Sequence, residues 1–118
     1  MDGHIAFNEP PLFPMSAEDF AELPTRVLPI YYTTQVTNSI AYGGNYNGMP
    51  RYCISIGMKE ILSSKKLVFF SSWPAAATAV RKVIDGPITA EVPGSLMQTH
   101  SDCTLFTTFE CLSIPLVI

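Results

Sequence analysis

Hydrophobic and polar positions change their spacing along the chain, and the order of these patterns predicts an α/β fold. Residues 66–70 are a short apolar run of the kind that is buried in a parallel sheet. Residues 75–84 carry apolar side chains at helical spacing and end at an Asp-Gly-Pro turn. Residues 104–109 alternate as in a strand. A strand, a helix and a further strand predict a mainly parallel sheet with flanking helices.

The first half of the chain gives weaker predictions. Prolines make residues 8–14 an irregular loop, and the Ser16-x-x-Asp pattern predicts a helix over residues 17–23. Residues 25–36 are rich in β-branched and aromatic side chains, which favours a strand that is interrupted near Pro29.

Two further segments follow this strand. Residues 43–50 contain three glycines, two asparagines and a proline, so we expect a loop. Residues 51–63 begin with the spacing of a strand and become helical after Gly57. No internal repeat or linker interrupts the pattern.

Length and composition predict one domain over residues 1–118. The chain has 118 residues, of which 47% are apolar and 14% are charged, so it can bury a core. Its net charge of -3 gives no basic surface, and we therefore expect no nucleic-acid partner.

Two further features concern the compartment. The longest apolar stretch, residues 67–77, is interrupted by polar residues and a proline, and no signal peptide precedes it, so we predict no membrane segment and a cytoplasmic location. The odd number of cysteines fits reduced thiols that serve as small core residues; they are Cys53, Cys103 and Cys111.

The densest group of chemically active side chains lies at the start of the chain, where Asp2, His4 and Glu9 fall within eight residues. A histidine titrates near neutrality and a neighbouring carboxylate can orient its ring, so the group is suited to acid/base catalysis on a small substrate. Two other interpretations are a solvated polar loop and a metal site. We predict no metal and no cofactor.

The same residues carry a resemblance. The string from Asp2 to Pro10 reads D-G-H-I-A-F-N-E-P and resembles the signature of the glucosamine-6-phosphate deaminases. The resemblance implies a partial Rossmann-like fold that corresponds to the C-terminal half of such an enzyme. It also implies that His4 is the acid/base that opens the sugar ring, that Asp2 and Glu9 orient and tune it, and that the ligand is a sugar phosphate.

Weaker matches extend the resemblance over most of the chain; they are residues 25–27, 36–39, 49–52, 56–58 and 95–100. In the family, the region after residue 38 is helical or irregular, so the resemblance also favours helix in part of residues 30–36. His100 lies in a stretch without an implied catalytic role, and we expect it to be structural.

The chain also departs from the family pattern. Ile40 stands where the family has an arginine, and Pro74 to Ala77 stand where the family has a lysine, so both cations that would hold the phosphate are lost. Arg51 and Arg81 are either substitutes or solvated surface residues. The upstream half, with the base for isomerisation, is not in this sequence.

These observations lead to two hypotheses. The chain acts on an amino-sugar phosphate and is incomplete alone, or it is an inactive module that binds a sugar phosphate or a protein. A partial sheet exposes an edge and apolar faces, so we also expect a homo-oligomer.

Overall fold

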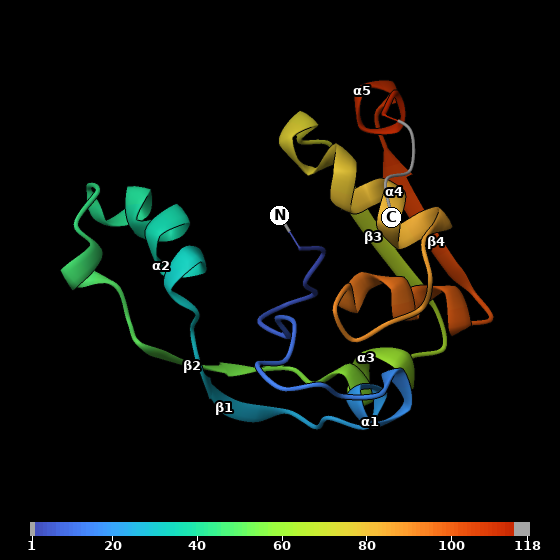
Figure 1. The fold of residues 1–118 in the computed structure, drawn as a ribbon, viewed down its shortest axis with the longest axis horizontal. Helices are drawn as coiled ribbons and strands as arrows, with labels where there is room; N and C mark the ends of the chain where they lie inside the picture. Colours follow the sequence, from blue (N-terminus) through green and yellow to red (C-terminus); the bar gives the residue numbers. More distant parts are fainter. Residues whose placement is uncertain (1, 115–118) are drawn as a thin grey trace.

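The computed structural model describes residues 2–114, which form a mixed α/β structure with a projecting arm (Figure 1). None of the helices in this range is long and apolar enough to cross a membrane. In chain order the elements, where η denotes a 3-10 helix, are α1 (Ala17–Ala21), β1 (Arg26–Pro29), α2 (Tyr32–Asn38), η1 (Ser39–Tyr42), η2 (Tyr46–Gly48), β2 (Tyr52–Ser55), α3 (Met58–Leu62), β3 (Leu67–Ser71), η3 (Pro74–Ala76), α4 (Ala77–Asp85), η4 (Pro93–Thr99), β4 (Cys103–Thr107) and α5 (Phe109–Leu112).

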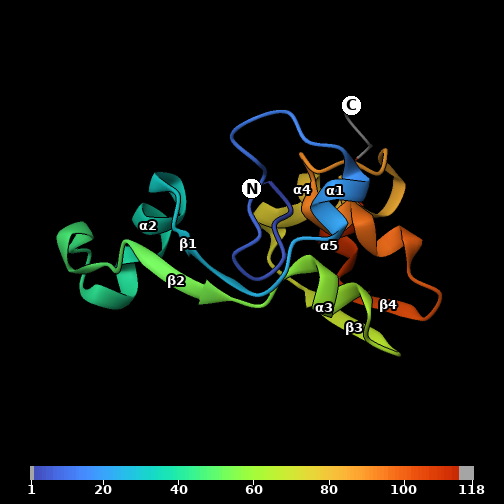
Figure 2. The same cartoon turned by 90° about the horizontal axis from the view of Figure 1, so that it is seen from below.

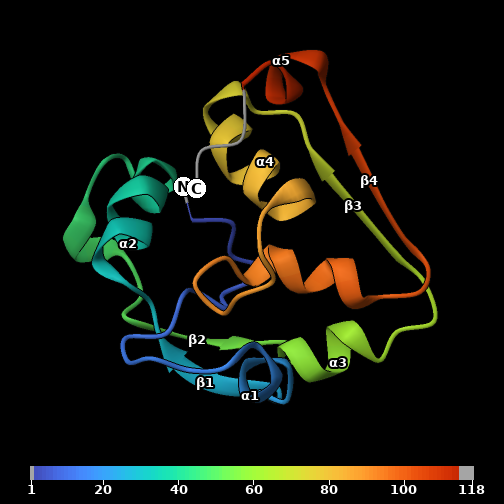
Figure 3. The same cartoon turned by 45° about the vertical axis from the view of Figure 1, so that its right-hand side comes forward.

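The main sheet is the parallel pair β3–β4, with α4 between the two strands in the sequence. Leu67 pairs with Cys103 at one end and Ser71 with Thr107 at the other. Helix α4 lies along one face of the pair (Figure 3). The predicted α/β fold, with a parallel sheet and flanking helices, is therefore confirmed. The strand predicted for residues 104–109 ends at Thr107, and α5 follows it.

The core lies on the same side of the sheet as α4. Alternate side chains of β3 and β4 point inward and pack against α1, α3 and η4, because successive residues of a strand face opposite sides. The buried apolar side chains at its centre are Phe20, Met58, Ala90, Leu96 and Met97. The sequence did not predict η4, whose buried residues complete this core.

The opposite face of the sheet is exposed in the described part of the chain. Val68, Phe70 and Phe106 point outward from β3 and β4, and Phe70 is 75% exposed. The rings of Phe70 and Phe106 stack with their centroids 5.2 Å apart.

Residues 26–55 form the arm, an antiparallel ribbon with a helical tip. Strands β1 and β2 pair from Arg26 with Ser55 to Pro29 with Tyr52. The ribbon leads away from the body to α2, η1 and η2 (Figure 2). The order of the sequence patterns gave no indication of this pairing.

The strand predicted for residues 25–36 is correct only as far as Pro29. The prediction of a strand over residues 30–36 is wrong. The helix that the resemblance favoured in part of this segment is confirmed as α2. Tyr31 and Thr34, at the start of α2, donate hydrogen bonds to the distant Glu9, and this tertiary contact outweighs the β-propensity of the threonines in the helix. A single domain over residues 1–118 stays a prediction.

Candidate active site around Asp2, His4 and Glu9

Residues 2–10, which we call the signature loop, are held in a tight turn by the side chain of Asn8. This side chain is fully buried, and its amide nitrogen donates hydrogen bonds to the carbonyl oxygens of Ile5, at 3.0 Å, and Ile56, at 2.9 Å. Its oxygen accepts a hydrogen bond of 2.9 Å from Arg26. Ala6 has a φ of 52°, in the left-handed region that non-glycine residues rarely adopt. Asn8 therefore fixes the shape of the loop between the catalytic candidates.

Two glycines allow the loop to lie against η4. The amide of Gly94 donates a hydrogen bond of 2.8 Å to the carbonyl oxygen of Gly3. A Cβ atom on Gly94 would lie 2.7 Å from Cγ2 of Val83, and Gly3 has a φ of 77°. Side chains at either position would therefore move the loop away from η4 or strain it.

Asp2 and His4 flank Gly3 and form a hydrogen-bonded pair. Nδ1 of His4 lies 2.7 Å from Oδ1 of Asp2, and the backbone amide of His4 donates to the same oxygen at 3.1 Å. Partial burial opposes ionisation of Asp2, but the hydrogen bonds from His4 outweigh it and lower the pKa of the carboxyl. An ionised carboxylate can only accept, so Nδ1 carries a hydrogen, and in the neutral ring Nε2 then presents its lone pair.

Glu9 is fixed by the first turn of α2. Its side chain is nearly buried, at 6% exposed. Its carboxylate accepts a hydrogen bond of 3.0 Å from the backbone amide of Tyr31 and another from the hydroxyl of Thr34. The hydroxyl of Tyr31 donates to the carbonyl oxygen of Pro10 at 2.7 Å. A negative charge at this end of a helix is favourable, so Glu9 joins the signature loop to the tip of the arm.

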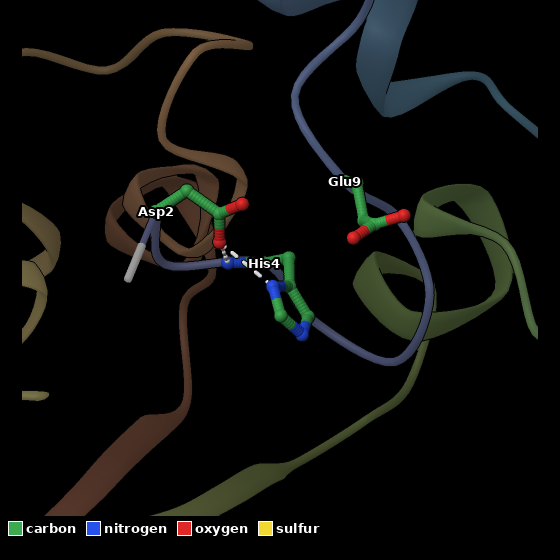
Figure 4. Close-up of side chains that lie close together, drawn as sticks. All are labelled: Asp2, His4 and Glu9. Atoms are coloured by element: carbon green, nitrogen blue, oxygen red, sulfur yellow. Dashed lines mark hydrogen bonds and ion pairs between the residues drawn. The ribbon is translucent and has the colours of Figure 1, made fainter. Parts of the chain in front are cut away.

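The three predicted site residues come together. One ligand atom each of Asp2, His4 and Glu9 lie within 4.8 Å of one another. Figure 4 shows the carboxylate of Glu9 opposite the ring of His4, with hydrogen bonds joining His4 to Asp2. Two carboxylates and an imidazole at this spacing can also hold a divalent cation. The absence of a metal and of a cofactor therefore stays a prediction.

A cavity of about 370 Å³ opens beside the pair. Asp2 and His4 lie in one wall, and most of the remaining wall is apolar, from β3, η3 and α4. Trp73 and Ala76 belong to that wall. Glu9 instead faces a second hollow of about 300 Å³, between the loop over residues 11–15 and β1.

Neither arginine that could replace the missing phosphate ligands lies in the wall of the first cavity. Arg51 bonds to Gln35 in the arm, with its guanidinium carbon 4.2 Å from the centroid of the Tyr46 ring. Arg81 forms an ion pair of 2.6 Å with Asp85. Both arginines therefore have partners of their own, away from this cavity.

The structure also places Ile40 and a residue of the 74–77 segment, where the family cations are lost. Ile40 is 81% exposed at the tip of the arm, and Ala76 lies in the cavity wall. The cavity wall consequently contains no lysine or arginine among the described residues.

The ring nitrogens of His100 are occupied by backbone groups. Nδ1 accepts a hydrogen bond of 3.0 Å from the amide of Asp102, and Nε2 lies 2.6 Å from the carbonyl oxygen of Ser64. Because Nδ1 accepts, Nε2 carries the hydrogen and donates. The ring therefore joins the loop before β3 to the loop before β4, as expected of a structural residue.

Sequence reasoning missed three residues of this region. Tyr31 and Thr34 hold Glu9 but lie more than 20 positions from it, and Trp73 was read only as part of an interrupted apolar stretch. Trp73 is the sole tryptophan in the chain, and this rarity could have marked it as a candidate. The other two carried no local pattern.

Comparisons with known proteins show which enzymes the chain is similar to. The chain is 36% identical over 110 residues to glucosamine-6-phosphate deaminase 2 of Bacillus subtilis, covering 92% of this chain and 41% of that protein. It is 40% identical over 101 residues to a glucosamine-6-phosphate deaminase of Lacticaseibacillus paracasei, covering 86% of this chain and 39% of the relative. No family model matches the chain.

A solved structure extends this similarity to the fold. The structure is that of a monomeric glucosamine-6-phosphate deaminase of the NagB superfamily, with a TM-score of 0.83 and 31% sequence identity over 97% of this chain and 44% of that one. The chain thus spans about two fifths of the length of the relatives it matches. The resemblance expected from the sequence is confirmed: in sequence and in fold, the chain is similar to part of a glucosamine-6-phosphate deaminase.

Proposed function

We propose that the chain supplies the ring-opening acid/base group of an enzyme that acts on an amino-sugar phosphate. The observation that supports this proposal most directly is the Asp2–His4 hydrogen bond of 2.7 Å beside a cavity. It leaves Nε2 of His4 free for proton transfer while the carboxylate fixes the ring. The names of the relatives supply the substrate class for this proposal.

The proposed step opens a cyclic hemiacetal. Nε2 of His4 takes the proton from the anomeric hydroxyl, the bond between the anomeric carbon and the ring oxygen breaks, and the imidazolium returns a proton to the ring oxygen. Asp2 stabilises the transient imidazolium by accepting from Nδ1. Glu9 lies close to this pair, and its bonds to Tyr31 and Thr34 keep it in place.

Ring opening is the part of the reaction that we assign to residues of this chain. Isomerisation and loss of ammonia belong to the whole deaminases, and we assign no residue to them. A cytoplasmic location belongs to the same proposal and is supported by three free cysteines.

Anomer exchange tests the proposal, because the two anomers interconvert through the open chain. We expect the purified chain to accelerate interconversion of the anomers of glucosamine 6-phosphate, measured by polarimetry or NMR. His4→Ala is expected to lower that acceleration by roughly a hundredfold, the lower end of the range for general acid/base catalysis. Ammonia release and fructose 6-phosphate formation are measured in parallel.

The matched control is the other histidine. His100→Gln leaves the Asp2–His4 pair intact and is expected to retain the acceleration, and circular dichroism verifies that both variants are folded. Equal acceleration by the wild type and His4→Ala would contradict the proposal. Absence of any acceleration by the folded wild type would contradict it too.

A further inference from the structure

The wall of the cavity next to His4 is unsuited to a phosphate group. The described residues place no lysine or arginine in it, and its one carboxylate belongs to Asp2. A phosphate in such a cavity loses hydration without gaining charge-assisted hydrogen bonds from a lysine or arginine, and the charge of Asp2 repels it. Hydrogen bonding to His4 lowers the pKa of Asp2, so this carboxyl is ionised near neutrality.

The same wall is well suited to the rest of an amino sugar. Trp73 is 55% exposed and forms part of the wall, so its ring is available for packing. An indole offers a large apolar surface to the C–H face of a sugar and attracts cations to its π face. Asp2 offers a charge partner for a protonated amino group. The cavity of about 370 Å³ lies at the small end of the usual range for ligand sites.

We infer that this cavity binds a 2-amino sugar through its ring and its ammonium group, with Trp73 as the stacking residue and Asp2 as the partner of the ammonium, and that it prefers the phosphate-free sugar to the 6-phosphate. The inference rests on the proposed function for the identity of the sugar. It assigns Trp73 a binding role and separates recognition of the ring from recognition of the phosphate.

Trp73 also provides the measurement, because it is the sole tryptophan in the chain. Titration with glucosamine is expected to change the tryptophan fluorescence to saturation, and glucosamine 6-phosphate is expected to require at least about tenfold higher concentration. Glucose, which lacks the amino group, is expected to bind roughly tenfold more weakly than glucosamine. Calorimetry gives an independent reading and is expected to show about tenfold weaker glucosamine binding by Trp73→Ala.

A gain of function distinguishes the missing cation from other causes. Ala76→Lys places an ammonium in the cavity wall and is expected to improve binding of glucosamine 6-phosphate by roughly tenfold relative to glucosamine. Thr78→Lys adds the same charge at an exposed position of α4 outside the wall and is expected to leave the ratio unchanged.

Three outcomes would overturn the inference: tighter or equal binding of the 6-phosphate by the wild type, no binding of glucosamine, or unaltered binding by a folded Trp73→Ala variant. Each is distinguishable from failure of the proposed function, which is judged by the dependence of anomer exchange on His4, measured with glucosamine as well as with its 6-phosphate. Binding of glucosamine without anomer exchange would refute the catalytic proposal and leave the binding inference standing. Anomer exchange together with preferred binding of the 6-phosphate would support the catalytic proposal and refute the binding inference.

Discussion

Gly94→Ala tests whether the packing of η4 against the signature loop positions the site. The new Cβ would lie 2.7 Å from Cγ2 of Val83 and 3.0 Å from the carbonyl oxygen of Gly3. Val83 is buried in α4 and cannot turn away freely. Overpacking of this kind costs about 1–3 kcal/mol. Loss of the hydrogen bond between Gly94 and Gly3 adds about 1 kcal/mol.

The expected loss in the free energy of unfolding is therefore about 2–4 kcal/mol, a large share of the roughly 5–15 kcal/mol of a typical domain. Urea unfolding followed by circular dichroism measures it. The matched control is Gly48→Ala, whose Cβ would contact only the side chains of Asn45 and Tyr42, at 3.4 Å or more. We expect that control to change stability by less than about 0.5 kcal/mol.

A double-mutant cycle identifies the cause. Val83→Ala removes the methyl group that clashes with the new side chain, so the two substitutions together should cost about 1–2 kcal/mol less than the sum of the single changes. Additive losses, or a Gly94→Ala variant as stable as Gly48→Ala, would refute the packing argument. The NMR signals of the His4 ring provide a second measurement. Their chemical shifts should change in Gly94→Ala and not in the control Gly48→Ala.

Three further predictions concern the loop itself. Asn8→Ala removes the three hydrogen bonds of a buried side chain and should lower the free energy of unfolding, measured in urea, by about 2–4 kcal/mol. An effect as small as that of Gly48→Ala would show that the turn holds without the amide. Glu9→Gln weakens the charge-assisted bonds to the start of α2, so hydrogen exchange there should speed up by roughly tenfold, and unchanged exchange would contradict the link. The folded-state pKa of Asp2 is depressed below its ordinary value of 3.8, so its contribution to stability is present above that value and is lost as pH falls through the folded pKa. Because the pair with His4 is more than a third exposed, the loss should be a few tenths of a kcal/mol, absent in Asp2→Asn; an equal acid loss in that variant would contradict the assignment.

The body of the fold could be predicted from the sequence because its signals are local. Residues 66–70 and 75–84 became β3 and the helical segment from η3 through α4, with boundaries shifted by one residue. The helix after Ser16 forms with the expected cap, in which the hydroxyl of Ser16 accepts from the amide of Asp19 at 3.0 Å. In each case, the periodicity and the terminal residues indicate the same structure.

The arm and the anchoring of Glu9 could not be predicted because they depend on contacts between distant residues. Thr33, Thr34 and Thr37 favour a strand by composition, yet the amide of Tyr31 and the hydroxyl of Thr34 bond to a carboxylate more than 20 residues away. By contrast, the close spacing of Asp2 and His4 in the sequence did indicate that these two residues could pair. The apolar wall that faces them comes from β3, η3 and α4, whose placement is a tertiary property.

The tip of the arm has a practical consequence for labelling. The arm leaves and returns through one pair of strands, so the ends of residues 30–51 are held close together. Gly43 and Gly44 turn the chain with positive φ, and a Cβ on either would meet no atom within 4 Å. Insertions at such exposed, closely anchored turns are usually tolerated. A short epitope or a dye-bearing cysteine between these glycines would report on movement of the arm while leaving the Asp2–His4 pair and its cavity unaltered.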